Sequence, residues 1–193
     1  MQFADVVARR RMVRSYRPDP VDPAVLDRIL DRASRAPSAG FSQPHRFVVV
    51  TSQRGRAAVA VACDEAAAVA RGLRPWISVA PVLVLPCVER QAYVERYDRP
   101  DKSGSAGPAG WAVPFEWVDA GAAFMLLLLA AVDEGLGAGF LAADPDRLRA
   151  AVDVPAGWAP LGVVTIGHPA EAAPVGSAAR RPRRPVAEMV RRV

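Results

Sequence analysis

The sequence predicts a single globular domain that contains both helices and strands. The chain has 193 residues, of which 51% are hydrophobic, and this is enough to bury a substantial core in one domain. Two patterns recur along it: short β-branched runs that suit buried strands, and longer segments of helical periodicity bounded by Asp-Pro or glycine signals. The longest apolar runs, 121–132 and 156–167, are too short to cross a membrane.

In the first half of the chain, helices are expected on both sides of a strand. Apolar residues at helical spacing predict a short helix over 2–11, and an Asp-Pro pair starts a longer helix over 23–36. The β-branched run 46–51 has the composition of a buried central strand. The alanine-rich stretch 53–71 predicts one further helix.

The middle of the chain combines a strand with a long aromatic segment. Residues 81–88 predict a second strand, in which Pro86 indicates either a sheet edge or an irregularity. Residues 89–117 lack sustained periodicity, and we expect a flexible lid over a pocket, or a contact with a partner subunit. If the segment folds over the pocket, its aromatic residues are candidates for substrate contact: Tyr93, Tyr97, Trp111 and Phe115.

The second half begins with the most apolar segment. Residues 118–135 predict a helix buried on most faces, with a central core or dimer role. A strand over 138–142, a capped helix over 144–151 and a third clear strand over 158–167 follow. The basic tail 180–193 contains two prolines that keep its first half extended.

Charge and cysteine usage exclude several classes of protein. The formal charge is +5, but of the 25 basic residues only Lys102 is a lysine, so the arginine excess looks compositional, and no nucleic-acid-binding motif accompanies it. Cys63 and Cys87 lie far apart in apolar segments, which fits a reduced, cytoplasmic protein. His45 and His168 lack metal-ligand spacing, and no signal-peptide apolar region begins the chain. We therefore expect no metal, no nucleic-acid partner and no membrane association.

A dense basic cluster near the amino terminus is the first candidate site. Four of the six residues 9–14 are arginines, and guanidinium groups bind phosphate oxygens in pairs. The alternative is a solvated basic face in an arginine-rich protein. A second basic cluster in the tail favours the binding interpretation, because both clusters could converge on one anion.

The stretch 36–44 is the second candidate site. A proline ends the preceding helix, and small residues then form a turn whose backbone N–H groups can lie open to a ligand. With the polar Ser38 and Gln43 on it, such a loop at a sheet edge could hold a flat polar ligand. An ordinary connection between a helix and a strand is the alternative.

Taken together, four stretches resemble the FMN-dependent nitroreductase family in the same order along nearly the whole chain. They are Arg10–Arg14 (RRMVR), Ala36–Pro44 (APSAGFSQP), Trp117–Gly137 and the Gly167-His168-Pro169-Ala170 stretch before the basic tail. The resemblance implies an α+β fold with a mixed sheet flanked by helices. It also implies an intertwined homodimer around the long apolar helix, with two FMN molecules at the subunit interface.

The resemblance also implies which residues bind the flavin. Arg10, Arg11 and Arg14 match phosphate and ribityl contacts, and Arg181 and Arg183 of the tail would complete the phosphate site. The loop that reaches the flavin from the other subunit is matched by Pro37, Ser38, Ala39 and Gln43. The strand end that lines the isoalloxazine ring is matched by Phe140, Leu141 and Ala142.

Three residues depart from the family pattern. Met12 stands at a cofactor-binding position where a small hydroxyl residue often holds the phosphate, Phe41 stands where asparagine is usual, and His45 replaces a frequent tryptophan. The first removes a phosphate hydrogen bond that the arginines could replace. The second removes a polar contact near the ring, which leaves a deazaflavin open as cofactor or electron donor.

The implied activity is hydride transfer from a nicotinamide donor through FMN to an electron-poor small molecule, such as a nitroaromatic, a quinone or a specialised metabolite. The protein would supply orientation and a dry slot, with no dedicated acid–base residue. Alternatives on the same scaffold are a deazaflavin-linked or flavin-modifying enzyme, and a non-catalytic flavin-binding homologue.

Overall fold

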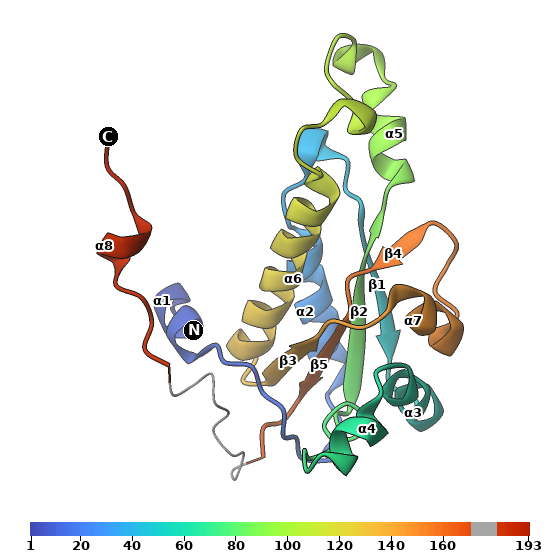
Figure 1. Ribbon diagram of the computed structural model, residues 1–193, viewed down its shortest axis with the longest axis vertical. Coiled ribbons are helices and arrows are strands. Elements are labelled where there is room, and N and C mark those ends of the chain that lie inside the picture. The colour runs from blue at the N-terminus through green and yellow to red at the C-terminus, as the bar shows by residue number, and fades with distance from the viewer. Residues whose placement is uncertain (171–180) are drawn as a thin grey trace.

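The computed structural model describes residues 1–170 and 181–193, in which an antiparallel sheet lies between two groups of helices (Figure 1). The helices are α1 (Phe3–Arg9), α2 (Pro23–Ser34), α3 (Gln53–Ala62), α4 (Glu65–Ala70), α5 (Gln91–Tyr97), α6 (Phe115–Asp133), α7 (Pro145–Val152) and α8 (Val186–Met189). The strands are β1 (His45–Val50), β2 (Val82–Glu89), β3 (Gly137–Leu141), β4 (Trp158–Pro160) and β5 (Val163–Gly167). Short 3-10 turns are η1 (Ala39–Phe41), η2 (Pro100–Lys102) and η3 (Pro108–Gly110).

The strand order is β1-β2-β5-β3, and β4 lies beside the second half of β2. The α+β class is confirmed, but the expectation of a mixed sheet is only weakly met. All pairings between the described strands are antiparallel, and the parallel component is a single bridge between Met12 and Ala138.

Strand β2 lies in the centre of the sheet, so the edge alternative for Pro86 is wrong and the irregularity is real. On one side the whole strand pairs with β1. On the other side β2 pairs with β5 over Val82–Val84 and with β4 over Cys87–Glu89. Pro86, which has no N–H to donate, falls in the gap between these two partners.

The expected strand 158–167 is two strands, because the chain bulges between β4 and β5. Three steps along β2, from Cys87 to Val84, correspond to four steps from Pro160 to Val164. Gly162 lies in this bulge with φ 147°, and a Cβ there would lie 2.4 Å from the carbonyl oxygen of Leu141. Glycine is therefore required where the chain changes register.

The side chains of β2 alternate between two cores. Val82 and Val84 pack with α2 and α6 on one face of the sheet, while Leu83 and Leu85 pack with α3 and α7 on the other. The expected helix 53–71 is broken into α3 and α4 at Asp64, whose φ is 53°.

Helix α6 starts three residues before its predicted start and is buried on one side only. By length and composition it could cross a bilayer, yet it packs against α2 and the sheet as the core helix of this domain. Its opposite side keeps large apolar residues exposed, and these are Trp117, Val118 and Met125.

The aromatic segment 89–117 contains more regular structure than expected. It includes α5, η2 and η3, and it extends beyond the amino-terminal end of α6 (Figure 1). Its rings pack edge-to-face on Trp111, with centroid distances of 5.2 Å to Tyr93, 5.5 Å to Tyr97 and 5.3 Å to Phe115. That this segment acts as a lid stays a prediction.

The basic amino-terminal segment lies directly on β3. The N–H of Val13 donates to the carbonyl of Ala138 at 2.9 Å, and a Cβ on Gly139 would lie 2.2 Å from the carbonyl oxygen of Val13. The buried Tyr16 hydroxyl donates to that carbonyl at 2.8 Å and lies 2.7 Å from the Thr165 hydroxyl. The close approach of the Val13 backbone to the sheet thus requires glycine at position 139.

A Gly139→Ala variant is expected to lose about 1–3 kcal/mol of unfolding free energy, because the new methyl group must displace the Val13 backbone or the strand. Gly110→Ala is the control, since the nearest atom to a Cβ there lies at an ordinary 3.5 Å. Urea denaturation of both variants measures the difference. Equal stability of the two variants would contradict the close packing at Gly139.

Candidate functional site

Arginines without an ionic partner among the described residues include three that lie beside the carboxyl end of α6. Within the described residues no carboxylate lies within ion-pair distance of Arg9, Arg10, Arg11 or Arg14. By contrast, α2 arginines such as Arg28 pair with Glu134 at 2.7 Å. Three of the four also line a cavity of about 470 Å³, formed by Met1, Ala8, Arg9, Arg10, Arg11, Val13, Val132, Gly135, Leu136, Gly137 and Pro169. Unneutralised guanidinium groups around a hollow are suited to an anionic ligand.

Arg14 is oriented by residues that the sequence analysis missed. Its guanidinium lies 5.4 Å from the centre of the Trp76 ring, in a cation–π contact. The backbone N–H groups of Trp76 and Ile77 in turn donate to the buried carboxylate of Glu65 at 2.7 and 2.6 Å. No local signal marks these residues, because Glu65 stands in an alanine-rich helix and meets the loop around Trp76 only in the folded chain.

Met12, the first departure from the family pattern, lies between these arginines and β3. It forms the isolated bridge to Ala138, and its side chain is exposed. The position therefore contributes backbone placement and an apolar side chain rather than a hydroxyl donor.

The small-residue loop, residues 36–44, has a strained backbone. Gly40, Phe41 and Gln43 have φ angles of 62°, 57° and 52°, which is unusual for the two residues that carry side chains. The Gln43 N–H donates to the Ser38 hydroxyl at 2.9 Å, which closes the loop on itself. Phe41 is 72% exposed, so the loop presents a large apolar ring to its surroundings.

His45 lies buried behind this loop. Its Nε2 lies 3.3 Å from the carbonyl oxygen of Ala36, and its Nδ1 has no hydrogen-bond partner among the described residues. Burial lowers the pKa of His45 below its ordinary value, while backbone hydrogen bonding at Ala36 and Pro37 opposes this shift in part. The residue is therefore neutral in the folded protein near pH 7.

The end of β3 points its side chains to alternate faces. Phe140 packs against Phe124 of α6, with ring centres 4.6 Å apart. Leu141 packs into the other core, and Ala142, just after the strand, is exposed. The β3 end therefore offers a small surface residue next to two partly buried apolar ones.

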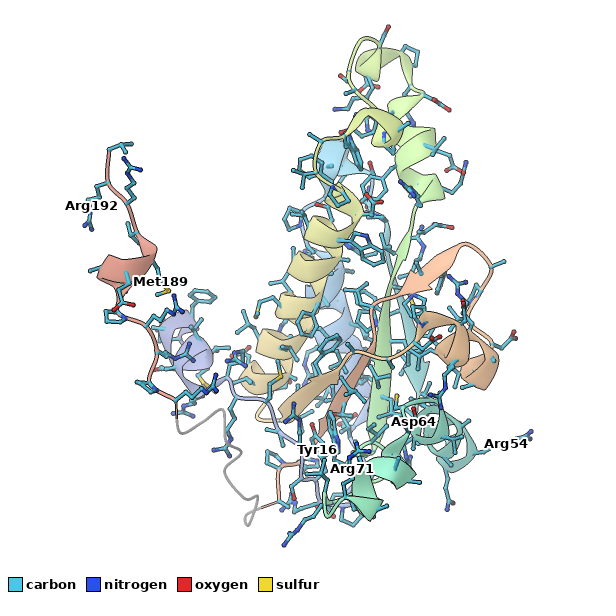
Figure 2. All side chains as sticks on the ribbon, viewed as in Figure 1. Tyr16, Arg54, Asp64, Arg71, Met189 and Arg192 are labelled. Carbon is cyan, nitrogen blue, oxygen red and sulfur yellow. The ribbon has the colours of Figure 1, made fainter. Side chains whose placement is uncertain are left out.

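The tail arginines are exposed and line no described cavity. Arg181 and Arg183 follow residues 171–180, which include Arg180 and lie outside the described residues. Figure 2 shows Met189 and Arg192 on a segment that stands apart from the sheet. Convergence of the two basic clusters stays a prediction.

Within one chain, the small-residue loop and the arginine-lined cavity lie near opposite ends of α6. The small-residue loop meets the helix at Asp119, whereas the cavity beside Arg10 includes Val132. These helix positions are 13 residues apart, which corresponds to about 20 Å at 1.5 Å per residue. A single chain therefore does not bring the loop to the arginines.

Comparison with known proteins gives a consistent family. The model of the nitroreductase family matches residues 7–168. A 5,6-dimethylbenzimidazole synthase of Rhodospirillum rubrum is 33% identical over 86% of this chain and 81% of the relative. An FMN reductase [NAD(P)H] of Bacillus subtilis is 30% identical over 91% of this chain and 67% of the relative. A nitroreductase structure from Exiguobacterium sibiricum in complex with FMN superimposes with a TM-score of 0.79, at 19% identity over 100% of this chain and 98% of the other.

The buried neutral His45 predicts a loss of stability in acid. Below about pH 6.5 the unfolded chain binds a proton that the folded chain resists, so the unfolding free energy falls by up to about 1.4 kcal/mol per pH unit. A His45→Gln variant is expected to lack this part of the decline, while His168→Gln retains it. Urea denaturation between pH 7.5 and about pH 5 measures it. Parallel pH profiles for the wild type and His45→Gln would contradict the buried neutral state.

Proposed function

The chain belongs to the nitroreductase family, and from that premise we propose how it works as an FMN-dependent oxidoreductase. Its electron donor is a nicotinamide and its acceptor is an electron-poor small molecule. Bound FMN supplies the redox chemistry, in which each turnover oxidises one nicotinamide and reduces the acceptor by two electrons. The chain's own residues bind the flavin, orient it and keep water out.

The single observation that carries this proposal is the clustering of arginines, three of which line one cavity, with no ionic partner among the described residues. A flavin phosphate needs charge-assisted donors, and Arg10, Arg11 and Arg14 offer them on a backbone segment fixed to β3. The donor set therefore fits FMN even though Met12 supplies no hydroxyl. Arg181 and Arg183 are proposed to complete the phosphate site from the tail.

The ring end of the site is proposed to combine two copies of the chain. Phe140, Leu141 and Ala142 line one side of the ring, and Pro37, Ser38, Ala39 and Gln43 reach it from the partner. The separation of about 20 Å within one chain supports this arrangement, because the loop does not reach the arginines of its own chain.

A homodimer through α6 would provide the second copy. Trp117, Val118 and Met125 leave an apolar side of this core helix exposed, and isolated monomers rarely retain such a surface on a central helix. Packing two such helices together buries these side chains and brings each small-residue loop towards the other chain.

The identity of the acceptor has two candidates. Reduction of a nitroaromatic, quinone or specialised metabolite is the first. Modification of the flavin itself is the second. The relative named 5,6-dimethylbenzimidazole synthase fits it in part, because the named product carries the same dimethyl-substituted benzene ring as a flavin. Flavin consumption during aerobic incubation with a nicotinamide would separate the two.

The activity is tested by loading the purified protein with FMN and adding NADH or NADPH without oxygen. We expect the visible flavin band to bleach and to return when a quinone or nitroaromatic is added. A bound flavin that neither nicotinamide bleaches would contradict the proposed electron donor and would favour a deazaflavin-linked or non-catalytic role.

The shared site predicts complementation between two defective chains. One parent carries Arg10→Ala with Arg14→Ala, and the other carries Ser38→Ala with Gln43→Gly, where glycine suits the φ of 52°. Each parent alone is expected to lose FMN affinity by about 10-fold or more, because charge-assisted hydrogen bonds and loop contacts are lost.

Mixed dimers of the two parents should regain one intact site in two. That site combines the unaltered arginines of one chain with the unaltered loop of the other. Recovery of half a flavin per chain in purified heterodimers is the expected result. No recovery would show that each site is built within one chain.

A further inference from the structure

We propose that Asp119, Tyr93 and Arg96 are positioning residues that hold the small-residue loop in its flavin-binding shape. This inference rests on the proposed function, since it concerns the loop that is proposed to reach the partner's flavin. The aromatic segment 89–117 would support that loop by hydrogen bonds and packing.

The loop needs supporting contacts because its backbone is strained. Left-handed φ angles at Phe41 and Gln43 each cost on the order of 1–3 kcal/mol, and they persist only where surrounding contacts fix them. The internal hydrogen bond to Ser38 closes the loop but does not attach it to the domain. Attachment must come from neighbouring elements.

Asp119 of α6 provides the first attachment. Its carboxylate is buried, and Oδ2 accepts hydrogen bonds from the Ala39 N–H at 2.8 Å and from the Tyr93 hydroxyl at 2.7 Å. Burial and hydrogen bonding to Asp119 raise the pKa of Tyr93 above its ordinary value, so the hydroxyl keeps the proton that it donates. One oxygen thus joins the loop, α5 and α6.

Arg96 of α5 provides the second attachment. Its Nε donates to the carbonyl of Gly40 at 2.7 Å, while its two terminal nitrogens donate to Asp101 at 2.8 and 2.7 Å. The paired contact with Asp101 fixes the plane of the guanidinium, so that Nε points at the loop.

The aromatic rings packed on Trp111 provide the third attachment, through van der Waals contact. A Cβ at Gly40 would lie 2.9 Å from the Tyr97 ring, so the ring packs directly on the loop backbone. Trp111 contacts the rings of Tyr93 and Tyr97 together. Because Tyr93 is completely buried, it acts behind the loop and not as a substrate contact in this arrangement.

Because of these contacts, the small-residue loop and α5 are expected to move together. A movement of segment 89–117 would remove the hydrogen bonds to Ala39 and Gly40 and release the strained turn. The segment would then control flavin affinity and ring placement through the loop backbone. In the proposed dimer this control acts on the partner's site.

The test compares FMN dissociation constants for single variants of the full-length protein, measured by quenching of flavin fluorescence. Asp119→Ala is expected to weaken binding by about 10- to 100-fold, because both charge-assisted contacts are lost. Asp119→Asn is expected to restore most of the affinity, since its single carbonyl oxygen can accept both hydrogen bonds. Glu116→Gln is the matched control, because this buried acid of the same helix contacts Arg90 and not the loop.

Arg96→Met and Arg99→Met give a second pair that keeps the inference testable if Asp119→Ala does not fold. Arg96→Met is expected to weaken FMN binding by about 3- to 10-fold. Arg99, exposed just after the same helix, has no hydrogen bond to the loop, so Arg99→Met should bind FMN as the wild type does.

Thermal melting and steady-state kinetics complete the test. A positioning role predicts that Arg96→Met lowers kcat and FMN affinity while its melting temperature stays close to that of Arg99→Met. Wild-type FMN affinity and kcat in Arg96→Met, or in a folded Asp119→Ala, would overturn the inference. Failure of the wild type itself to bind FMN would instead contradict the proposed function.

Discussion

Positive charge without a protein counter-charge is the constraint on which the rest of this structure depends. Arg9, Arg10, Arg11 and Arg14 repel one another, and the described part of the chain places no carboxylate beside them. The fold holds them together nevertheless, because the backbone that carries them is fixed to β3 by the Val13 hydrogen bond and by the buried Tyr16 hydroxyl. This arrangement would keep the proposed anion site assembled before its anion arrives, which would reduce the entropic cost of binding.

The same domain leaves its loop strained and the outer side of α6 apolar. Both features are unfavourable in an isolated chain. The proposed dimer would cover α6, and a ligand contact on the partner would offset the backbone strain of each loop. Asp119 links the two features, because it lies on α6 and accepts hydrogen bonds from the loop and from Tyr93 of the aromatic segment. Flavin binding, dimer formation and the order of segment 89–117 are therefore expected to be coupled.

Local patterns predicted most of the fold. The starts of α2 and α7 follow from their Asp-Pro pairs, and β1 and β3 lie within one residue of their predicted ranges. The break at Asp64 was not predicted. The residue has a φ of 53°, and its carboxylate pairs with Arg147, which only the fold brings near. In the site, the arginine cluster is visible in the sequence, whereas Trp76, Glu65 and Asp119 act through partners that only the fold brings near. The distance between loop and arginines is likewise a property of the long α6 and not of any motif.

In the proposed dimer each flavin is held by two chains. Sedimentation velocity of the FMN-loaded protein, recorded at the visible flavin band, tests this arrangement. We expect flavin absorbance to sediment only with a species of two chains of 20.6 kDa each, at a stoichiometry of one flavin per chain. Flavin that sediments with a single 20.6 kDa chain would contradict it, because the loop and the arginines of one chain lie at opposite ends of α6.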